Sequence, residues 1–303
     1  PAFALPVMSA LLKSNYNVVA VYSQPDKVAG RGNKVSVPPV KEYAIRHGLS
    51  VFQPDSLKSQ SVQEQLMSLS PDLIVVAAYG LILPKTVLDV PVKGCLNLHP
   101  SLLPKYRGPT PVASAILNGE SVTGVTIITM DEGMDTGPIV ATKNVPIEFD
   151  ETTFTLTTKL FELGAELLVS VLPDWLNGSV SPREQDSSAA VCTRKFVKED
   201  GYIDWSRSAV QIERSVRAFQ PWPGCYTRWN GKLVKILDSS VTDSEIMKEP
   251  NLGVVLAMGS DDIGISTSSG ILEVHQLQVE GKRPVDSREF ILGNPCFIGA
   301  KLG

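Results

Sequence analysis

The sequence predicts an α/β fold in which a parallel, Rossmann-like sheet domain precedes a small OB-like β-barrel domain. In the first half, apolar runs such as 17–22, 72–78 and 124–130 alternate with segments of helical periodicity. Continuous rather than alternating apolarity is typical of parallel strands covered by helices on both faces. In the second half, short strand-like runs are separated by turn signals such as Asn230-Gly231, as in small barrels.

The elements of the first domain follow from their spacing. Apolar residues of segment 3–13 recur at helical intervals, so the given sequence begins with a helix. An α/β domain normally begins with a strand, so we expect a first strand upstream of this sequence. The expected strands cover 17–22, 50–53, 72–78, 94–99 and 124–130, and the expected helices cover 38–47, 61–68 and 152–172.

Three regions are expected along the chain: a catalytic domain at 1–178, a linker at 179–198 and a barrel at 199–303. The linker is polar, contains Ser181-Pro182 and lacks periodicity. In the last region, an expected helix at 208–219 precedes expected strands at 225–229, 233–237, 253–257, 263–266 and 270–277. A length of 303 residues suits two domains.

Composition excludes some classes of protein. The net charge is −4 at pH 7, whereas a protein that coats nucleic acid should be strongly basic. No apolar run reaches the length of about 18 residues that a membrane helix needs, so no membrane partner is expected, and no signal peptide is visible. The scattered cysteines and few histidines argue against a metal site and favour a reduced, cytoplasmic location. The four cysteines are Cys95, Cys192, Cys225 and Cys296.

The strongest chemical pattern ends the strand expected at 94–99. Asn97 and His99 are two residues apart, so both side chains project from one face of that strand. An amide beside an imidazole combines an oxyanion donor with a proton shuttle, and Asp135, after the next strand, could orient the imidazole. Each residue also has a structural interpretation, as a strand terminator, a buried histidine or a turn residue. The motifs of serine hydrolases and P-loop proteins are absent.

Segment 97–108 resembles the Asn-x-His…Ser-Leu-Leu-Pro-x-x-Arg-Gly signature of the folate-dependent formyltransferases, and 123–137 is similar to their second block. Segment 24–34 resembles a loop of the branch that acts on methionyl-tRNA, and 204–206 and 218–224 resemble its C-terminal domain. The resemblance implies the two-domain fold above, 10-formyltetrahydrofolate as formyl donor and the initiator methionyl-tRNA as acceptor. It also implies that Asn97, His99 and Asp135 are catalytic. Small departures flank the site at Pro100 and Pro109-Thr110.

A mechanism follows as an expectation from that resemblance. The acceptor amine attacks the formyl carbon, and the Asn97 amide hydrogen-bonds the oxyanion. His99, held protonated beside Asp135, supplies a second donor. The proton could then travel through His99 or through a water near Asp135.

The folate pterin needs a flat and mostly apolar slot. We expect one wall in the loop after the strand at 72–78 and the other in segment 133–136, although the loop could equally pack into the core. The predicted folate contacts are Tyr79, Gly80, Leu81, Ile82, Leu83, Pro84, Ser101, Leu102, Leu103, Pro104, Gly133, Met134 and Thr136. No metal is expected.

The loop 26–41 is basic and contains glycines at its tip, which favours contact with tRNA. We predict that Arg31 contacts the acceptor end and that lysines bind phosphate; the predicted tRNA contacts are Lys27, Arg31, Lys34 and Arg107. Acidic residues outnumber basic ones in 199–303, so any binding face there must be a local patch. Its candidates are Arg214, Arg217, Arg228 and Lys232, with Arg194, Lys195 and Lys198. Trp222 is expected in the core, with stacking on a base as the alternative.

Other functions remain open at this point. Within the enzymes, a formyltransferase acting on an amino-sugar nucleotide shares the Asn-x-His and Asp motifs, and a formyl-folate hydrolase would use water in place of the amine. A dinucleotide-dependent oxidoreductase is disfavoured because no G-x-G-x-x-G follows a visible strand. A non-catalytic nucleic-acid-binding module is disfavoured by the acidic balance. A monomer is the default expectation.

Overall fold

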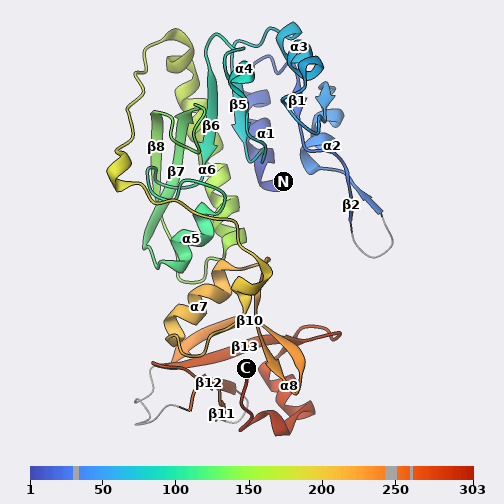
Figure 1. Cartoon of the computed structure of the whole chain (residues 1–303), viewed down its shortest axis with the longest axis vertical. Helices are drawn as coiled ribbons and strands as arrows, with labels where there is room; N and C mark the ends of the chain where they lie inside the picture. The colour runs from blue at the N-terminus through green and yellow to red at the C-terminus, as the bar shows by residue number, and fades with distance from the viewer. Residues whose placement is uncertain (30–33, 243–250, 260–261) are drawn as a thin grey trace. The chain divides into compact units, whose positions relative to one another are not determined.

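The structure is a computed structural model, and it describes residues 1–29, 34–242, 251–259 and 262–303. The chain forms two compact units, drawn in Figure 1. The first comprises Pro1–Pro111, Val122–Pro146 and Thr157–Thr193. The second comprises Val112–Ser121, Ile147–Leu156 and Arg194–Gly303. The expected domain boundaries at 178 and 198 stay a prediction.

The first unit carries two separate parallel strand pairs and an antiparallel hairpin. Its helices are α1 (Leu5–Lys13, after the 3-10 turn Ala2–Ala4), α2 (Pro39–Arg46), α3 (Gln60–Ser68), α4 (Lys85–Leu88) and most of α6 (Thr153–Asn177). Its strands are β1 (Val21–Tyr22), β2 (Lys27–Ala29), β3 (Lys34–Ser36), β4 (Val51–Phe52), β5 (Ile74–Ala77), β6 (Cys95–His99), β7 (Val122–Thr129) and β8 (Ile139–Pro146). The sheets are β1–β4, β2–β3 and β5–β6–β7–β8.

The direction of the strands corrects one expectation. β1 runs parallel to β4, and β5 runs parallel to β6, as predicted. The strand expected at 124–130 is β7, and it runs antiparallel to both β6 and β8, with His99 opposite Thr126. The prediction of an all-parallel sheet is therefore wrong for β7. A continuous run of apolar residues indicates that a strand is buried on both faces. A buried antiparallel strand has the same pattern as a parallel one, so the pattern does not give the direction.

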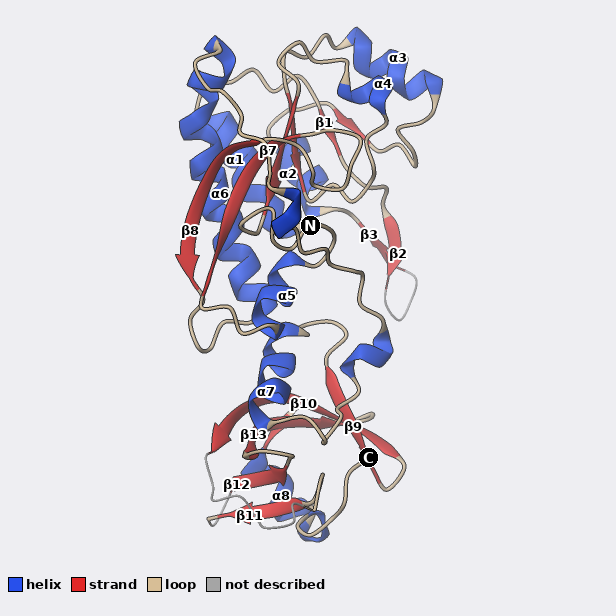
Figure 2. Ribbon diagram, turned by 60° about the vertical axis from the view of Figure 1, so that its left-hand side comes forward, coloured by secondary structure: helices blue, strands red, loops and turns tan. Residues whose placement is uncertain are grey.

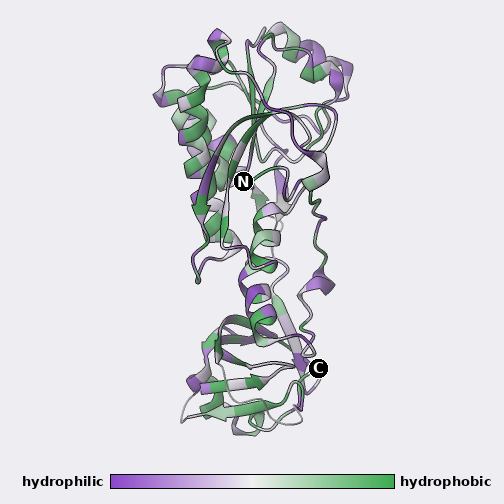
Figure 3. Cartoon of the chain, turned by 90° about the vertical axis from the view of Figure 1, so that its left-hand side faces the viewer, coloured by the Kyte–Doolittle hydropathy of each residue, from purple (hydrophilic) through white to green (hydrophobic). Residues whose placement is uncertain are grey.

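The core of the first unit decides which way the residues of β6 point. Leu96 and Leu98 of β6 are buried against α1 and α6, in a cluster that includes Phe161. Figure 2 shows α6 lying along the sheet, and Figure 3 shows hydrophobic residues along its strands. Alternate residues of a strand face opposite sides, and Cys95 belongs to a different cluster with α3 and α4. Asn97 and His99 therefore face away from α6.

The long helix α6 continues beyond its predicted end. Pro173 lies inside the helix, which ends at Asn177 instead of Leu172. Proline normally interrupts a helix because it lacks the N–H donor. Here the apolar face continues past it, since Trp175 packs against the core and its indole N–H donates to the carbonyl of Lys93 at 3.0 Å. Among the described residues, no helix is long and apolar enough to cross a membrane.

The second unit is built on an antiparallel sheet. Its strands are β9 (Cys225–Trp229), β10 (Lys232–Thr242), β11 (Val255–Met258), β12 (Asp262–Ser266), β13 (Ile271–Val279) and β14 (Val285–Asp286). Its helices are α7 (Ala209–Ala218), α8 (Ser287–Gly293) and all but the first residue of α5 (Pro111–Leu117). The strand order is β11-β12-β13-β10-β9, with β14 on β13. Within the described residues the end strands β9 and β11 do not pair, so the predicted OB-like barrel is not confirmed.

The core of the second unit contains a different tryptophan from the one expected. Trp222, expected in the core, is 57% exposed. Trp229 instead packs edge-on against Phe290 and Phe297, with ring centroids 6.0 and 4.9 Å away. A helix of this unit begins at a capping motif of the usual kind. Ser208 and Gln211, for example, form a reciprocal capping box at the start of α7.

Candidate active site

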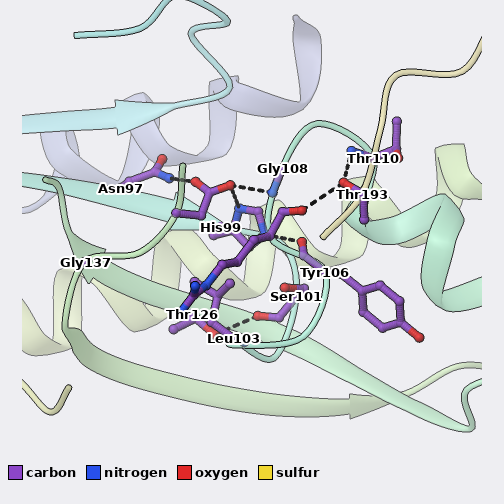
Figure 4. A network of polar contacts seen from close by, with 12 residues as sticks. Asn97, His99, Ser101, Leu103, Tyr106, Gly108, Thr110, Thr126, Gly137 and Thr193 are labelled. Atoms are coloured by element: carbon purple, nitrogen blue, oxygen red, sulfur yellow. Dashed lines mark hydrogen bonds and ion pairs between the residues drawn. The ribbon is translucent and has the colours of Figure 1, made fainter. Parts of the chain in front are cut away.

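The three residues predicted to be catalytic lie together at the end of β6. The amide nitrogen of Asn97 is 3.4 Å from Oδ1 of Asp135. Nδ1 of His99 is 3.6 Å from Oδ2 of the same carboxylate. The backbone N–H of Gly108 donates to Oδ2 at 2.7 Å. Figure 4 draws these contacts around one carboxylate. Their catalytic roles stay predictions.

Asp135 reaches this place by a different route from the one expected. The C-terminal end of β7 lies beside Leu96, at the start of β6, because the two strands are antiparallel. Asp135 therefore does not project from a neighbouring strand end. It comes from the connection between β7 and β8, which turns back toward His99. Asp135 has a φ of +54°, in the left-handed region that non-glycine residues rarely occupy.

Left-handed backbone recurs around the carboxylate. Tyr106 has a φ of +62°, and its carbonyl contacts His99. Gly108 has a φ of +104°, and a Cβ placed there would lie 2.9 Å from both the carbonyl and the hydroxyl oxygen of Thr193. A strained non-glycine residue persists only where its surroundings over-determine it, and such residues cluster at functional sites. The left-handed backbone at Asp135 and Tyr106 therefore agrees with a functional role for this part of the structure.

The protonation of His99 differs from the expectation. His99 is 4% exposed, and its Nε2 is 3.0 Å from the Tyr106 carbonyl, so Nε2 carries a hydrogen that it donates. Burial lowers the pKa of His99, although Asp135 and the Tyr106 carbonyl both act to raise it. Burial therefore favours the neutral form of His99, in which Nδ1 presents a lone pair toward Asp135. This form would act as a proton acceptor, whereas the protonated His99 expected from the resemblance would act as a donor.

Two of the predicted folate contacts in the loop after β6 have buried side chains. Ser101 is fully buried, and its hydroxyl donates to the carbonyl of Lys105 at 2.7 Å. Leu103 packs with Ile128 and Ile139 in a buried cluster. Their side chains therefore support the loop after β6 from within. Any contact of these two residues with folate would have to come from their backbone, and it stays a prediction.

Another group of predicted folate residues lies in the loop after β5. Ala77 is opposite Leu98 in the parallel pair β5–β6, so the loop that begins at Ala78 starts beside His99. In that loop Ile82 is 80% exposed, whereas Leu83 is buried. The rest of it consists of Tyr79, Gly80, Leu81 and Pro84.

The second predicted wall of the folate slot is held by its own side chains. Asp131 accepts hydrogen bonds from the backbone N–H of Gly133 and from the hydroxyl of Thr136, at 3.0 and 2.7 Å. Met134 is 62% exposed, and its sulfur would be 3.3 Å from a Cβ at Gly108. The two loops thus leave apolar side chains exposed. Contacts of folate with them, and with Leu102 and Pro104, stay predictions.

The predicted tRNA contacts fare differently from one another. Arg107 is 7% exposed, and its guanidinium donates to Oε1 of Gln185 from Nε and from a terminal nitrogen, at 3.0 and 2.9 Å. In this structure the guanidinium is thus engaged within the protein, and its contact with tRNA stays a prediction. Lys27 is exposed. Arg31 lies outside the described residues, and so does the side chain of Lys34. The expected loop is partly the hairpin β2–β3.

Two further polar groups near this loop are already paired. Lys41, counted among its positive charges, forms an ion pair with Asp26 at 2.7 Å. Gln53 donates to the same carboxylate at 2.8 Å. The Gln53 bond and the lysine together lower the pKa of Asp26. The ion pair leaves the net charge of segment 26–41 at +3, as the sequence gives it, but it engages Lys41 within the protein.

Sequence reasoning missed the residues that connect the site to segment 179–193. Gln185 donates from Nε2 to the carbonyls of Asp135 and Gly137, at 2.8 and 2.7 Å. Thr193 accepts a hydrogen bond from the backbone N–H of Thr110. This polar segment has no periodicity, so it was interpreted as a linker. In the structure, residues up to Thr193 belong to the first unit.

Within the ranges that the structure describes, no group of three or more His, Cys, Asp and Glu side chains is placed to hold a metal ion.

Comparison with known families covers nearly the whole chain. The family model described as Formyl transferase matches residues 2–172, and the one described as Formyl transferase, C-terminal domain, matches residues 195–295. A methionyl-tRNA formyltransferase of Chloroflexus aggregans is 45% identical, over 97% of this chain and 94% of its own length. The methionyl-tRNA formyltransferase of Pseudoalteromonas translucida is 43% identical, over 100% of this chain and 95% of its own length.

Solved structures are similar at the level of the fold. The sugar 3N-formyl transferase WlaRD, solved with dTDP and 5-N-formyl-THF, has a TM-score of 0.67 and 20% identity. It matches 93% of this chain and 95% of its own. HypX from Aquifex aeolicus, solved with tetrahydrofolic acid, has a TM-score of 0.61 and 20% identity. That match spans 90% of this chain and 46% of HypX.

The predicted family is thus confirmed by matches that include both halves of the sequence. Full-length relatives at 43–45% identity share its order of parts. The chain belongs to the formyl transferase family.

Proposed function

We propose that this protein transfers a formyl group from 10-formyltetrahydrofolate to the α-amine of the initiator methionyl-tRNA, for translation initiation. The observation that carries the proposal is the convergence of Asn97 and His99 on the Asp135 carboxylate, in a chain of the formyl transferase family. The choice of acceptor rests on the full-length relatives that are methionyl-tRNA formyltransferases. The solved sugar formyltransferases share the fold at 20% identity, which favours no acceptor.

Asn97 supplies the oxyanion donor in this proposal. Attack by the amine places negative charge on the formyl oxygen, and a donor fixed beforehand stabilises that charge. The Asn97 amide has two N–H groups. One is directed at Oδ1 of Asp135, which fixes the orientation of the amide and leaves the second N–H for the substrate oxygen.

In this proposal His99 and Asp135 transfer the proton that the attacking amine loses. The attacking amine must lose a proton, and the folate nitrogen that departs must gain one. The lone pair of Nδ1 on a neutral His99 and Oδ2 of Asp135 are 3.6 Å apart, so a proton taken by either group lies within reach of the other. The N–H of Gly108 stabilises the anionic form of Asp135. The pair can therefore accept the proton of the amine and return it.

The formyl donor fits the loops that flank this cluster. A pterin needs apolar contact on its faces and hydrogen bonds at its edge. Ile82 and Met134 expose apolar side chains on either side. The hydroxyls of Tyr22 and Tyr79 are buried and have no hydrogen-bond partner among the described residues. Unpaired buried hydroxyls are unfavourable without a partner, and a polar ligand edge would supply one.

Each unit offers basic residues as candidate contacts for the acceptor. Lys27 is exposed in the first unit, and Arg31 and Lys34 remain proposed contacts. In the second unit Arg217 is bound to Glu213, and Arg194 to Asp200. Its exposed candidates are Lys195, Lys198, Trp222, Arg228 and Lys232. The barrel assignment for 199–303, the monomeric state and the cytoplasmic location stay proposals.

The experiment that tests the proposal compares different formyl acceptors. The protein is incubated with 10-formyltetrahydrofolate and, in separate reactions, with methionyl-tRNA, uncharged tRNA and amino-sugar nucleotides, while loss of the formyl donor is followed. Turnover with methionyl-tRNA alone is the expected result. Turnover with a sugar amine alone would keep the catalytic cluster and overturn the tRNA assignment. Release of formate without an acceptor would identify a hydrolase.

A substitution at Asn97 tests the chemistry. Asn97→Ala should lower kcat by about 10²- to 10³-fold, the usual effect of removing one oxyanion donor. The KM for the formyl donor should change little, because the amide is proposed to act on charge that develops in the transition state. A kcat close to that of the unmodified protein would refute the role of Asn97.

A further inference from the structure

We propose that Gln185 and Arg107 are positioning residues, which fix the Asp135 carboxylate for reaction by holding the backbone of its turn. The proposal rests on the catalytic role of Asp135 in the proposed function. It assigns a role to a segment that the sequence marked as a linker, and to an arginine that the sequence assigned to tRNA.

The side-chain amide of Gln185 makes four hydrogen bonds, two through its nitrogen and two through its oxygen. Its Nε2 donates to the carbonyl of Asp135 at 2.8 Å and to that of Gly137 at 2.7 Å. Its Oε1 accepts two hydrogen bonds from the Arg107 guanidinium, at 3.0 and 2.9 Å. One side chain thereby joins the loop after β6 to the loop after β7. The amide cannot be turned over without facing donors with donors and acceptors with acceptors.

The surrounding segment holds the same two loops by its backbone. Arg183 exchanges two backbone hydrogen bonds with Ile139, at 2.7 and 2.8 Å. Val191 accepts from the N–H of Arg107 at 2.9 Å, and the N–H of Thr193 donates to the carbonyl of Arg107 at 2.8 Å. Residues 183–193 thus form a strap that is anchored at both ends. Gln185 is the side chain of this strap that contacts the turn of Asp135 itself.

The turn of Asp135 needs such support. Asp135 adopts a left-handed backbone, which is unfavourable for a residue with a side chain. Gly137, two residues later, is so close to the carbonyl of Thr129 that a Cβ there would collide with it. The carbonyls of Asp135 and Gly137, which Gln185 binds, lie at the two ends of this tight stretch. Releasing them would let the carboxylate move away from Asn97, His99 and the N–H of Gly108.

Arg107 holds Gln185 in turn. Its guanidinium presents a planar fork that fits one carbonyl oxygen from two donors. Arg107 is 7% exposed and Gln185 is half-buried, so the contact is partly shielded from water. Arg107 is also the residue before Gly108, whose N–H donates to Oδ2 of Asp135. The arginine therefore links the backbone and the side-chain contacts of the carboxylate.

The variants separate positioning from simple folding. Gln185→Met keeps the length of the side chain and removes all four hydrogen bonds. Gln185→Glu keeps and strengthens the contact with Arg107, so it keeps the strap anchored. It places acceptors against the carbonyls of Asp135 and Gly137, so it should still disturb the turn. The neighbouring Glu184 is exposed, and Glu184→Ala is the matched control.

The first measurement is the split between kcat and KM in the full chain. A displacement of about 1 Å in a catalytic group can lower the rate by about 100-fold. We expect both Gln185 variants to lower kcat by up to about 100-fold, with the KM for methionyl-tRNA and for the formyl donor nearly unchanged. The melting temperature of Gln185→Glu should stay close to that of Glu184→Ala. Equal kcat in the Gln185 variants and the control would overturn the proposal.

A double-mutant cycle with Asp135→Asn tests whether Gln185 acts through Asp135. In that background, Gln185→Met should have little further effect on single-turnover rates, because effects of residues that act as a unit do not multiply. Multiplying effects would mean that Gln185 acts elsewhere, and would overturn the inference. If Asp135→Asn alone leaves the rate normal, the proposed catalytic role of Asp135 fails instead. The two failures are therefore distinguishable.

Discussion

At the scale of single residues, His99 makes a prediction about pH. Its imidazole is buried, and burial lowers its pKa below the ordinary value of 6.5. An unfolded chain would therefore bind a proton at this position at a higher pH than the folded chain does. Stability rises with pH wherever the unfolded state binds more protons. The contribution of neutral His99 is thus complete above pH 6.5 and is lost as the pH falls toward its lowered pKa.

The measurement is the free energy of unfolding between pH 7.5 and pH 5, by urea titration. The unmodified protein should lose more stability over this range than His99→Gln, which can still donate to the Tyr106 carbonyl. His47 is exposed, so His47→Gln should follow the unmodified protein. Parallel curves for His99→Gln and the unmodified protein would show that burial of His99 does not set this dependence.

For single residues of the site, the sequence predicts some positions and not others. The spacing of Asn97 and His99 placed both on one face of β6, because alternation along a strand is a local property. Asp135 was expected from its place after the next strand, but its backbone conformation and its position in the connection between β7 and β8 could not be foreseen. Arg107 and Ser101 were assigned to ligands although both are buried. Burial of a loop residue depends on segments far away in sequence, here the strap that contains Gln185.

At the scale of elements, the contact between α6 and β6 depends on Gly164. A Cβ at this position would lie 2.5 Å from Leu98 Cδ1 and 2.9 Å from Val125 Cγ2. Replacing glycine by alanine inside a helix normally gains up to about 1 kcal/mol, whereas overpacking a core loses about 1–3 kcal/mol. The loss should exceed the gain, so we expect Gly164→Ala to be destabilising.

Chemical denaturation measures this effect. Gly293 in α8 provides the control, because a Cβ there has no atom within 4 Å. Gly293→Ala should be neutral or slightly stabilising, and Gly164→Ala should lower the denaturation midpoint. If Gly164→Ala were as stable as its control, the close packing of α6 on Leu98 would be contradicted.

Elements were predicted well where periodicity is strong. The helices α1, α2, α3 and α7 and the strands β5 and β6 were found within a few residues, because each has a continuous apolar face or core. The strand β8 was missed, since its middle residues are exposed and give no apolar run. The predicted direction of β7 and the predicted end of α6 before Pro173 were wrong, because both features depend on tertiary packing.

At the scale of the whole molecule, the order of an α/β part and a β part followed from the sequence. The change from long apolar runs to short strands separated by turns marks it. Closure of the second sheet into a barrel could not be derived in the same way, since it depends on pairing between distant edges. The net charge of the chain limits how it can bind its proposed partner, tRNA. With a net charge of −4, binding of an anionic tRNA must come from local basic patches.

Local patches make a prediction about salt. Each lysine that neutralises a phosphate releases counterions, so the KM for methionyl-tRNA should rise steeply with salt, whereas the KM for the formyl donor should not. Lys27→Ala should lower the slope of log KM against log salt by about 1. Lys58 is also an exposed lysine of the first unit, and Lys58→Ala should leave that slope unchanged. A slope for Lys27→Ala equal to that of the control would place the phosphate away from the β2–β3 hairpin. A KM for methionyl-tRNA independent of salt would contradict binding through basic patches altogether.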